Sequence, residues 1–199
     1  MKLLLHSCCG PCTVYPLEAL RAEGFELSGY FYNPNIHPFR EFKERYKSYQ
    51  LLCEKEGLPA EIDRSYGLET YLAALYGSGT PVAERCALCY RLRLEAACQK
   101  ARELGFPAYS TTLLVSPYQK HELIRELGEE IGRRQGVEFI YRDFRPGFRP
   151  AQEKAREMGL YLQGYCGCIF SEYDRYGPRK RKNPPPPADG LGPSANSGS

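Results

Sequence analysis

The sequence predicts an α/β fold in which helices flank a parallel sheet. Short apolar runs that are typical of buried strands alternate along the chain with longer segments of helical periodicity. Glycine, proline and asparagine clusters separate these segments, as turns require. The length of 199 residues suits one domain with a small appendage. Strands that alternate with helices imply right-handed crossover connections, and therefore strands that run in parallel.

The first half of the chain opens with a predicted buried strand at 2–7, which ends at the first cysteines. A helix follows at 13–21, because Val14, Leu17 and Leu20 recur at helical spacing. The pattern continues with a strand at 25–32, a long polar helix at 39–56, a short strand at 60–63 and a weak helix at 67–76.

The second half begins with a strong helix at 84–104, which Gly105 and Pro107 bring to an end. A strand rich in Thr, Tyr and Val is predicted at 108–115. A helix at 117–134, a strand at 137–142 and a last helix at 151–160 complete the pattern. We expect ligands beyond the carboxyl ends of these strands, as in other open parallel sheets.

The end of the chain differs in composition from the rest. Residues 179–182 are all basic, and a Pro-rich and then Gly/Ser-rich segment follows them. Such a composition cannot bury a core, so we expect a domain over 1–174 and a disordered tail over 175–199. The net charge of +3 permits an RNA partner without requiring one.

Seven of the nine cysteines fall in three tight clusters, which are Cys8-Cys9-Gly10-Pro11-Cys12, Cys86-Ala87-Leu88-Cys89 and Cys166-Gly167-Cys168. Disulfide-dense domains are usually small and secreted, whereas this chain is long enough to bury a core. Its first apolar run is too short for a signal peptide or a membrane span. We therefore expect a cytoplasmic protein without a membrane partner, whose thiols bind metal or take part in catalysis.

The first two clusters together offer a set of metal ligands. Cys86 and Cys89 lie three residues apart near a predicted helix start, so they share one face, and the helix N-terminus favours their thiolates. Cys8 and Cys9 lie at a strand-to-helix turn, from which both can reach one centre. Four thiolates suffice for a [4Fe–4S] cluster or for a structural zinc. The thiols beyond four favour redox chemistry.

The remaining thiols suggest two further roles. Cys166 and Cys168 can form a strained, labile disulfide across a flexible glycine, although they can also be a second pair of metal ligands. Cys12 is left over, as a ligand to a second metal or as a proton donor. Tyr32, Asn33, Asn35 and His37 follow the second predicted strand, and the stretch 110–118 follows another. Their aromatic and amide side chains make both loops candidates for binding a nucleoside.

Taken together, the motifs resemble one family closely. His6-Ser7-Cys8-Cys9-Gly10-Pro11-Cys12, the segment from Glu84 to Arg93 and Tyr165-Cys166-Gly167-Cys168 are similar to motifs of the cobalamin-independent epoxyqueuosine reductases, in the same order. The stretches 31–38 and 110–117 also match. The resemblance covers residues 2–173 and implies a Rossmann-like, nucleotide-hydrolase-like fold.

The resemblance also implies an activity. Such enzymes reduce the epoxide of epoxyqueuosine at the tRNA wobble position to queuosine with release of water, the last step of queuosine biosynthesis. By this resemblance Cys8, Cys9, Cys86 and Cys89 would hold a [4Fe–4S] cluster, and Cys166 and Cys168 would be the redox-active pair. Cys12 would act beside them, with a possible second mononuclear iron. A separate electron donor would be a partner.

Two other functions compete with this reading. An ATP-dependent tRNA thiolase would share the sheet, but it needs a glycine-rich phosphate loop where this chain has Ser7-Cys8-Cys9-Gly10-Pro11-Cys12. A zinc-stabilised RNA-binding module would use the same thiols without redox chemistry.

Overall fold

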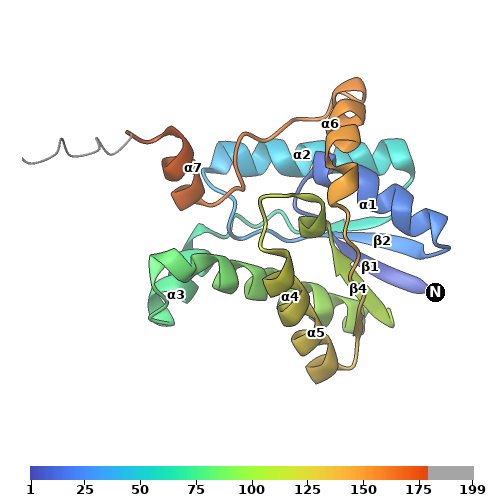
Figure 1. Ribbon diagram of the computed structural model, residues 1–199, viewed down its shortest axis with the longest axis horizontal. Helices are drawn as coiled ribbons and strands as arrows, with labels where there is room; N and C mark the ends of the chain where they lie inside the picture. Colours follow the sequence, from blue (N-terminus) through green and yellow to red (C-terminus); the bar gives the residue numbers. More distant parts are fainter. Residues whose placement is uncertain (179–199) are drawn as a thin grey trace, which may run out of the picture.

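The computed structural model describes residues 1–178 and shows five parallel strands in one sheet with helices on both faces (Figure 1). The strands lie in the order β3-β2-β1-β4-β5, which is the order of a Rossmann-type sheet. Their bounds are β1 Lys2–His6, β2 Glu26–Phe31, β3 Ala60–Ile62, β4 Ala108–Thr111 and β5 Glu138–Phe139. The prediction of a parallel α/β sheet is confirmed.

Helices α1 (Gly10–Ala22), α2 (Phe39–Glu56) and α6 (Phe148–Glu157) cover one face of the sheet, and α4 (Arg85–Glu103) and α5 (His121–Gln135) cover the other (Figure 1). Helix α3 (Leu68–Gly77) packs on α4, and α7 (Ile169–Tyr176) follows the third cysteine cluster. Short 3-10 turns occupy Val82–Glu84, Thr112–Val115 and Arg145–Gly147.

The central strand β1 is the middle of the core, because Leu3, Leu4 and Leu5 have no exposed surface and both neighbouring strands pair with it. Both faces of this strand are covered by helices, so it reads as a continuous apolar run rather than an alternating one. Its register aligns His6 with Tyr30 of β2 and with Thr111 of β4. The residues that follow β1 and β4 therefore emerge side by side.

A close helix contact fixes the turn after β1. A Cβ on Gly10 would lie 2.7 Å from the backbone oxygen of Ser48, so glycine lets the start of α1 approach α2. Pro11 occupies the first turn of α1, where it removes a backbone N–H that has no partner within the helix. The cysteines on either side of this pair are thereby held at the carboxyl edge of the sheet.

Several predicted boundaries differ from the structure. The helix predicted at 117–134 begins at His121, the strand predicted at 137–142 is limited to Glu138–Phe139, and the helix predicted at 151–160 lies at Phe148–Glu157. Helix α1 begins at Gly10 rather than at 13, so Cys12 lies in its first turn. The strand predicted at 108–115 ends at Thr111. Helix α7 was not predicted, and it reaches Tyr176, two residues into the segment predicted as tail. Residues 179–199, and with them most of that predicted tail, lie outside the described residues. No helix within residues 1–178 is long and apolar enough to span a bilayer.

Candidate active site at the carboxyl edge of the sheet

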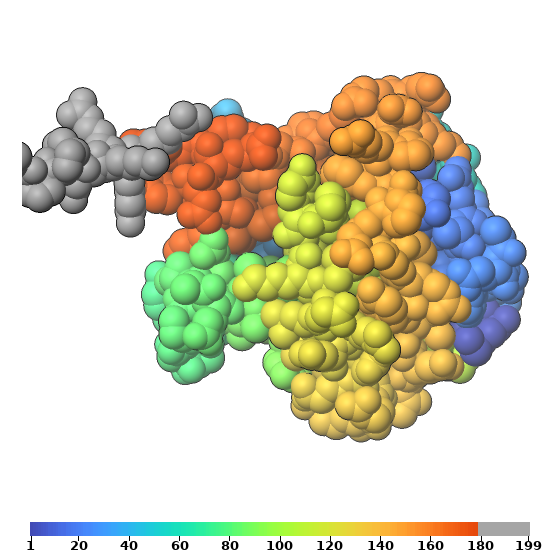
Figure 2. All heavy atoms as spheres, viewed as in Figure 1, coloured from blue at the N-terminus to red at the C-terminus, as the bar shows by residue number. Residues whose placement is uncertain are grey.

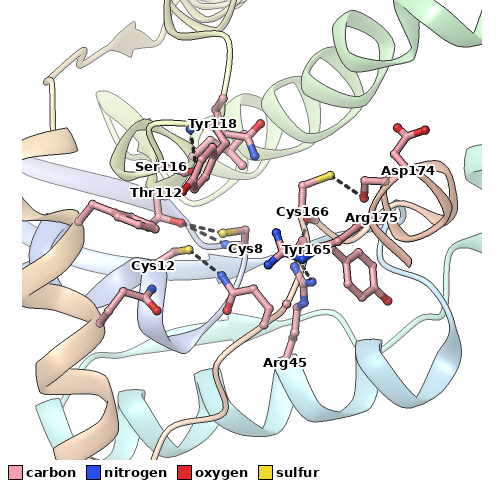
Figure 3. Close-up of a pocket in the computed structure, with 17 residues that line it drawn as sticks. Cys8, Cys12, Arg45, Thr112, Ser116, Tyr118, Tyr165, Cys166, Asp174 and Arg175 are labelled. Atoms are coloured by element: carbon pink, nitrogen blue, oxygen red, sulfur yellow. Dashed lines mark hydrogen bonds between the residues drawn. The ribbon is translucent and has the colours of Figure 1, made fainter. Parts of the chain in front are cut away.

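A cavity of about 540 Å³ opens at the carboxyl edge of the sheet (Figure 3). Its walls come from the turn after β1, the segment after β4, helix α6 and the third cysteine cluster with α7. The sulfur-bearing residues among them are Cys8, Cys12 and Cys166. Sites with this placement are where parallel sheets bind ligands, so the cavity is the candidate active site.

The first cluster forms a compact group of three buried thiols, Cys8, Cys9 and Cys12, whose Sγ atoms all lie within 4.8 Å of one another. We name it the N-terminal thiol group. Cys9 precedes helix α1, and Cys12 lies in its first turn. Gln163 donates a hydrogen bond of 3.1 Å to Cys12 Sγ from the far end of the chain. This spacing suits a shared metal centre.

The three thiols differ in acidity. The Cys8 sulfur accepts hydrogen bonds from the Cys12 thiol and the Cys9 thiol. These bonds, of which the one from Cys12 has the larger effect, hold the pKa of Cys8 well below its usual range. Burial raises the pKa of Cys9, and hydrogen bonding to Cys8 raises the pKa of Cys12. One thiolate is therefore easily formed, and a metal that takes all three sulfurs must displace the other protons.

The second cluster lies at the start of α4. Cys89 is buried and packs with Cys168 and Tyr71, whereas Cys86 is half-buried. Burial raises the pKa of Cys89 to about 11 although Arg93 lies beside it. Arg93 donates hydrogen bonds to the Cys89 carbonyl at 3.0 Å and to Cys89 Sγ at 3.1 Å. The structure thus joins Cys89 to the third cluster.

Arg93 is a buried cation of unusual surroundings. Its side chain is 3% exposed, and among residues 1–178 no carboxylate lies within 4.0 Å of it. Its positive charge interacts instead with the sulfurs of Cys89, Cys8 and Cys166. Because a buried charge needs a counter-charge, the site is suited to hold thiolates or another anionic centre.

The third cluster forms a loop between α6 and α7. Cys166 is exposed and lines the cavity, and its thiol donates a 3.0 Å hydrogen bond to Ser171 Oγ. Cys168 is buried and caps α7, where its sulfur accepts from the Ser171 N–H at 3.3 Å. The one S–H of Cys166 is shared between Ser171 Oγ and the Cys168 sulfur; its hydrogen bonding to Cys168 lowers the pKa of Cys168 to about 4 and raises the pKa of Cys166. Such a thiol–thiolate pair is primed for disulfide chemistry.

Arg45 anchors this loop from helix α2. Its guanidinium, 1% exposed, pairs with Glu41 at 2.7 Å and donates to the carbonyl oxygens of Tyr165 at 2.8 Å and Cys166 at 3.1 Å. The backbone N–H of His37 donates to the Gly167 carbonyl at 2.8 Å. Gly167 has a φ of 122°, a conformation that favours glycine between the two cysteines.

The four residues predicted to bind a nucleoside lie beside this loop. Asn33, Asn35 and His37 are buried, and Tyr32 is half-buried and stacks on Tyr30. None of the four is among the described residues that line the cavity. Their contact with substrate stays a prediction. The segment predicted at 110–118 does contribute to the wall, through Thr112, Leu113, Ser116 and Tyr118.

The sequence analysis did not single out Arg45, Arg93 or Gln163. Arg93 follows Cys89 by four residues, a spacing that places both on one helix face and could have suggested the contact. Arg45 follows Glu41 by the same interval, which on a polar helix is usual for an exposed ion pair. Gln163 carries no local signal, because it meets Cys12 only through the fold.

Comparisons with known proteins find one family. The model of the family described as epoxyqueuosine reductase QueH matches residues 3–174. The chain is 36% identical over 176 residues to the epoxyqueuosine reductase QueH of Dehalococcoides mccartyi, covering 88% of this chain and 95% of that protein. It is 32% identical over 184 residues to the QueH of Thermotoga maritima, covering 87% and 91%.

Among solved structures, the chain is similar to a predicted subunit of tRNA methyltransferase from Methanocaldococcus jannaschii. The TM-score is 0.52 at 13% identity, over 79% of this chain and 75% of the other. At this identity the likeness shows a shared fold alone. The match of the family model over most of the chain shows more, and it identifies the chain as a member of the QueH family of epoxyqueuosine reductases.

Proposed function

We propose that this chain reduces the epoxide of epoxyqueuosine in tRNA to queuosine with an iron–sulfur cluster and a redox-active dithiol. Membership of the family supports this reaction, since the relatives are named epoxyqueuosine reductases. The cysteines that line the cavity, Cys8, Cys12 and Cys166, and the packing of Cys89 on Cys168 support the proposed cofactor and dithiol. tRNA is its substrate, and a reducing cytoplasm, where such thiols stay free, is its proposed location.

The residues present fit an anionic metal–thiolate centre. The N-terminal thiol group offers three sulfurs within 4.8 Å of one another, and Arg93 is a buried cation that touches Cys89 and acts on Cys8. We propose Cys8, Cys9, Cys86 and Cys89 as the ligands of a [4Fe–4S] cluster, with Cys12 beside it for a second iron or as a proton donor. When bound, such a cluster supplies one-electron transfer and a Lewis-acidic iron.

The dithiol of Cys166 and Cys168 balances the reaction. Closing one S–S bond from this thiol–thiolate pair gives up two electrons and the Cys166 proton, and Cys12 or water supplies a second proton. The substrate uses the two electrons and the two protons: its two epoxide C–O bonds break, a C=C bond forms, and the oxygen leaves as water. Cys166 supports this role because it lines the cavity beside Cys8 (Figure 3). A separate electron donor then reduces the disulfide for the next turnover.

The test begins with anaerobic purification and quantification of iron, sulfide and zinc. Iron with sulfide supports the proposal, whereas zinc alone would favour a structural zinc site. Cys8→Ser should lose iron. Cys53→Ser is the matched control, because Cys53 is a buried thiol on α2 that does not line the cavity.

Cys168→Ser separates the dithiol from the metal site. We expect iron and the absorbance of the cluster to be retained, while conversion of epoxyqueuosine to queuosine, followed by nucleoside mass spectrometry, falls at least about 100-fold, since the second sulfur of the S–S bond is gone. Turnover equal to that of the parent protein would remove the redox role of this pair.

A further inference from the structure

One aromatic side chain at the cavity is largely open to solvent. Tyr118 is 85% exposed, more than any other large apolar or aromatic side chain within residues 1–178, yet it lines the cavity. Figure 3 shows it on the opposite side of the cavity from Arg45. In Figure 2 the segment that leads into α5, yellow-green, protrudes between α7 in red-orange and α6 in orange.

This side chain is held in place although it is exposed. The Tyr118 ring meets Phe148 edge-on, with ring centroids 6.1 Å apart and planes at 85°. The backbone N–H of Tyr118 donates to Ser116 Oγ at 3.3 Å. The next two residues are fixed by Tyr90 of α4, whose hydroxyl donates to Gln119 at 2.6 Å and accepts from the Lys120 N–H at 3.2 Å. A ring that is held in place and still largely exposed can stack on a planar ligand at little entropic cost.

Two exposed cations accompany the aromatic pair. Lys120 lies two residues after Tyr118, and Arg149 directly follows Phe148. Within residues 1–178 neither has a carboxylate within 4.0 Å, in contrast to Arg145, which pairs with Asp143. Aromatic rings interleaved with free positive charges are the combination that binds single-stranded RNA.

The size of the cavity explains why such a surface is needed. A volume of about 540 Å³ is that of a small-molecule pocket and accommodates one nucleoside. Enzymes that act on a base within a longer nucleic acid take that base out of its stack, which leaves the neighbouring bases without a stacking partner. The rest of the anticodon loop must therefore lie on the rim of the cavity.

We propose that Tyr118, braced by Phe148, stacks on the nucleotide next to the modified one, while Lys120 and Arg149 contact its phosphates. We call these four residues the rim shelf. The proposal rests on the proposed function only for the kind of ligand, an anticodon loop. It assigns to the rim shelf the binding of RNA and not the chemistry of the epoxide.

Equilibrium binding of RNA tests the rim shelf without any turnover. The metal-loaded protein is titrated into a fluorescent anticodon stem–loop that carries unmodified guanosine at the wobble position. We expect Tyr118→Ala to weaken binding about 5- to 150-fold, since stacking on an aromatic side chain contributes about 1–3 kcal/mol per base. Tyr118→Phe keeps the ring and should bind within about twofold of the parent.

The control is Tyr76→Ala, because Tyr76 is also highly exposed (67%) but lies on α3 and does not line the cavity. Its affinity should equal that of the parent. Lys120→Gln and Arg149→Gln should each reduce the slope of log affinity against log salt by about 0.7, the value for one contact to a single-stranded phosphate. Circular dichroism melts confirm that each variant is folded.

Several outcomes would overturn the proposal. Equal affinity of Tyr118→Ala and the parent would do so, as would an equal loss in Tyr76→Ala or a parent that does not bind the stem–loop. These results leave epoxide reduction untouched as a separate measurement. Conversely, a protein that fails to reduce the epoxide but binds RNA through Tyr118 would refute the proposed function and keep the rim shelf.

Discussion

Two buried arginines lie near the thiols, and they differ in the groups that balance their positive charge. Arg45 has a carboxylate partner in Glu41, so its charge is balanced by its own helix. Arg93 has sulfur atoms as its nearest anionic partners, so its charge is balanced only when thiolates are present. The two residues therefore do different work: Arg45 organises a loop, and Arg93 favours negative charge in the site.

Arg93→Met tests this difference. We expect the variant to retain less than half of the iron of the parent after anaerobic gel filtration with a chelator, because the proposed cluster would lose its compensating cation. In a thermal melt the metal-free variant should differ from the metal-free parent less than the loaded proteins differ, because burial leaves Cys89, the sulfur that Arg93 contacts, with a pKa of about 11 and hence neutral at pH 7.

Arg91→Met is the matched control on the same helix, since Arg91 is half-buried, does not line the cavity and pairs with Glu130. It should keep the iron content of the parent. Equal iron retention in the two variants would contradict the electrostatic role of Arg93.

Ser171 is placed to tune the proposed redox pair of Cys166 and Cys168. Its hydroxyl accepts a hydrogen bond from the Cys166 thiol, which exists only in the reduced form. Ser171→Ala should therefore destabilise the dithiol by about 1 kcal/mol and make the reduction potential about 20 mV more negative. Equilibration with glutathione buffers and thiol trapping measures the shift.

Ser65→Ala should leave this potential unchanged, because Ser65 is exposed and its hydrogen bond to Asp63 comes from the backbone N–H, which the substitution keeps. A potential for Ser171→Ala that is equal to or less negative than that of the parent would show that the Ser171 hydroxyl does not stabilise the dithiol.

At the scale of elements, one glycine sets how closely α2 packs on the sheet. A Cβ on Gly29 of β2 would lie 1.9 Å from the hydroxyl of Tyr49, a fully buried side chain of α2 that stacks on Phe31. Gly29→Ala should therefore lower the free energy of unfolding by about 1–3 kcal/mol, as overpacking does. Urea unfolding followed by circular dichroism measures the change.

Gly77→Ala provides the comparison, because a Cβ at the end of α3 would meet nothing within 4 Å. Alanine is the better helix former, so this variant should be neutral or up to about 1 kcal/mol more stable. A Gly29→Ala protein as stable as Gly77→Ala would mean that Tyr49 moves aside freely.

Most elements could be predicted from periodicity, and the exceptions have local causes. Helix α2 has the predicted bounds. The strand at 108–115 ends early because Thr111 Oγ1 accepts from the Leu113 N–H and starts a 3-10 turn. Helix α6 begins before the predicted 151, since Pro150 is tolerated in a first turn. Helix α7 is short and starts from a cysteine cap, a signal that propensity does not contain.

The candidate site could be predicted in part. The alternation of strands and helices predicts one edge for the ends of β1 and β4, so thiols at that edge could be expected to meet. The sequence could not predict which thiols share a centre, because the distances between Cys8, Cys89 and Cys168 depend on how α4 and the last loop pack. The buried arginines were missed for the same reason, as burial of a charged side chain is a property of the fold.

At the scale of the whole molecule, the site depends on contacts between remote segments. Arg45 of α2 holds the loop 161–168 at the cavity by donating to the Cys166 carbonyl. At the start of this loop, the Tyr161 hydroxyl donates to the Glu41 carboxylate at 2.5 Å, and the Tyr161 N–H donates to Ser48 Oγ at 3.1 Å. Arg45→Met should release this loop, and hydrogen exchange by mass spectrometry should show faster exchange at 161–168 than in the parent.

The same change should lower the free energy of unfolding by about 3–5 kcal/mol, because Glu41 is left as a buried charge without its partner. Arg40→Met is the control, since Arg40 is exposed on the same helix. Unchanged exchange at 161–168 in Arg45→Met would show that the loop holds its place by other contacts.

The spread of the cavity wall along the chain, from Cys8 to Arg175, has a consequence for biosynthesis. A nascent chain that has emerged from the ribosome as far as Cys89 presents Cys8, Cys9, Cys12, Cys86 and Cys89 but not yet the loop that carries Cys166 and Cys168. A metal centre inserted at that stage would lie in an open cradle, and the wall of the cavity would be complete only after the segment up to Arg175 has emerged.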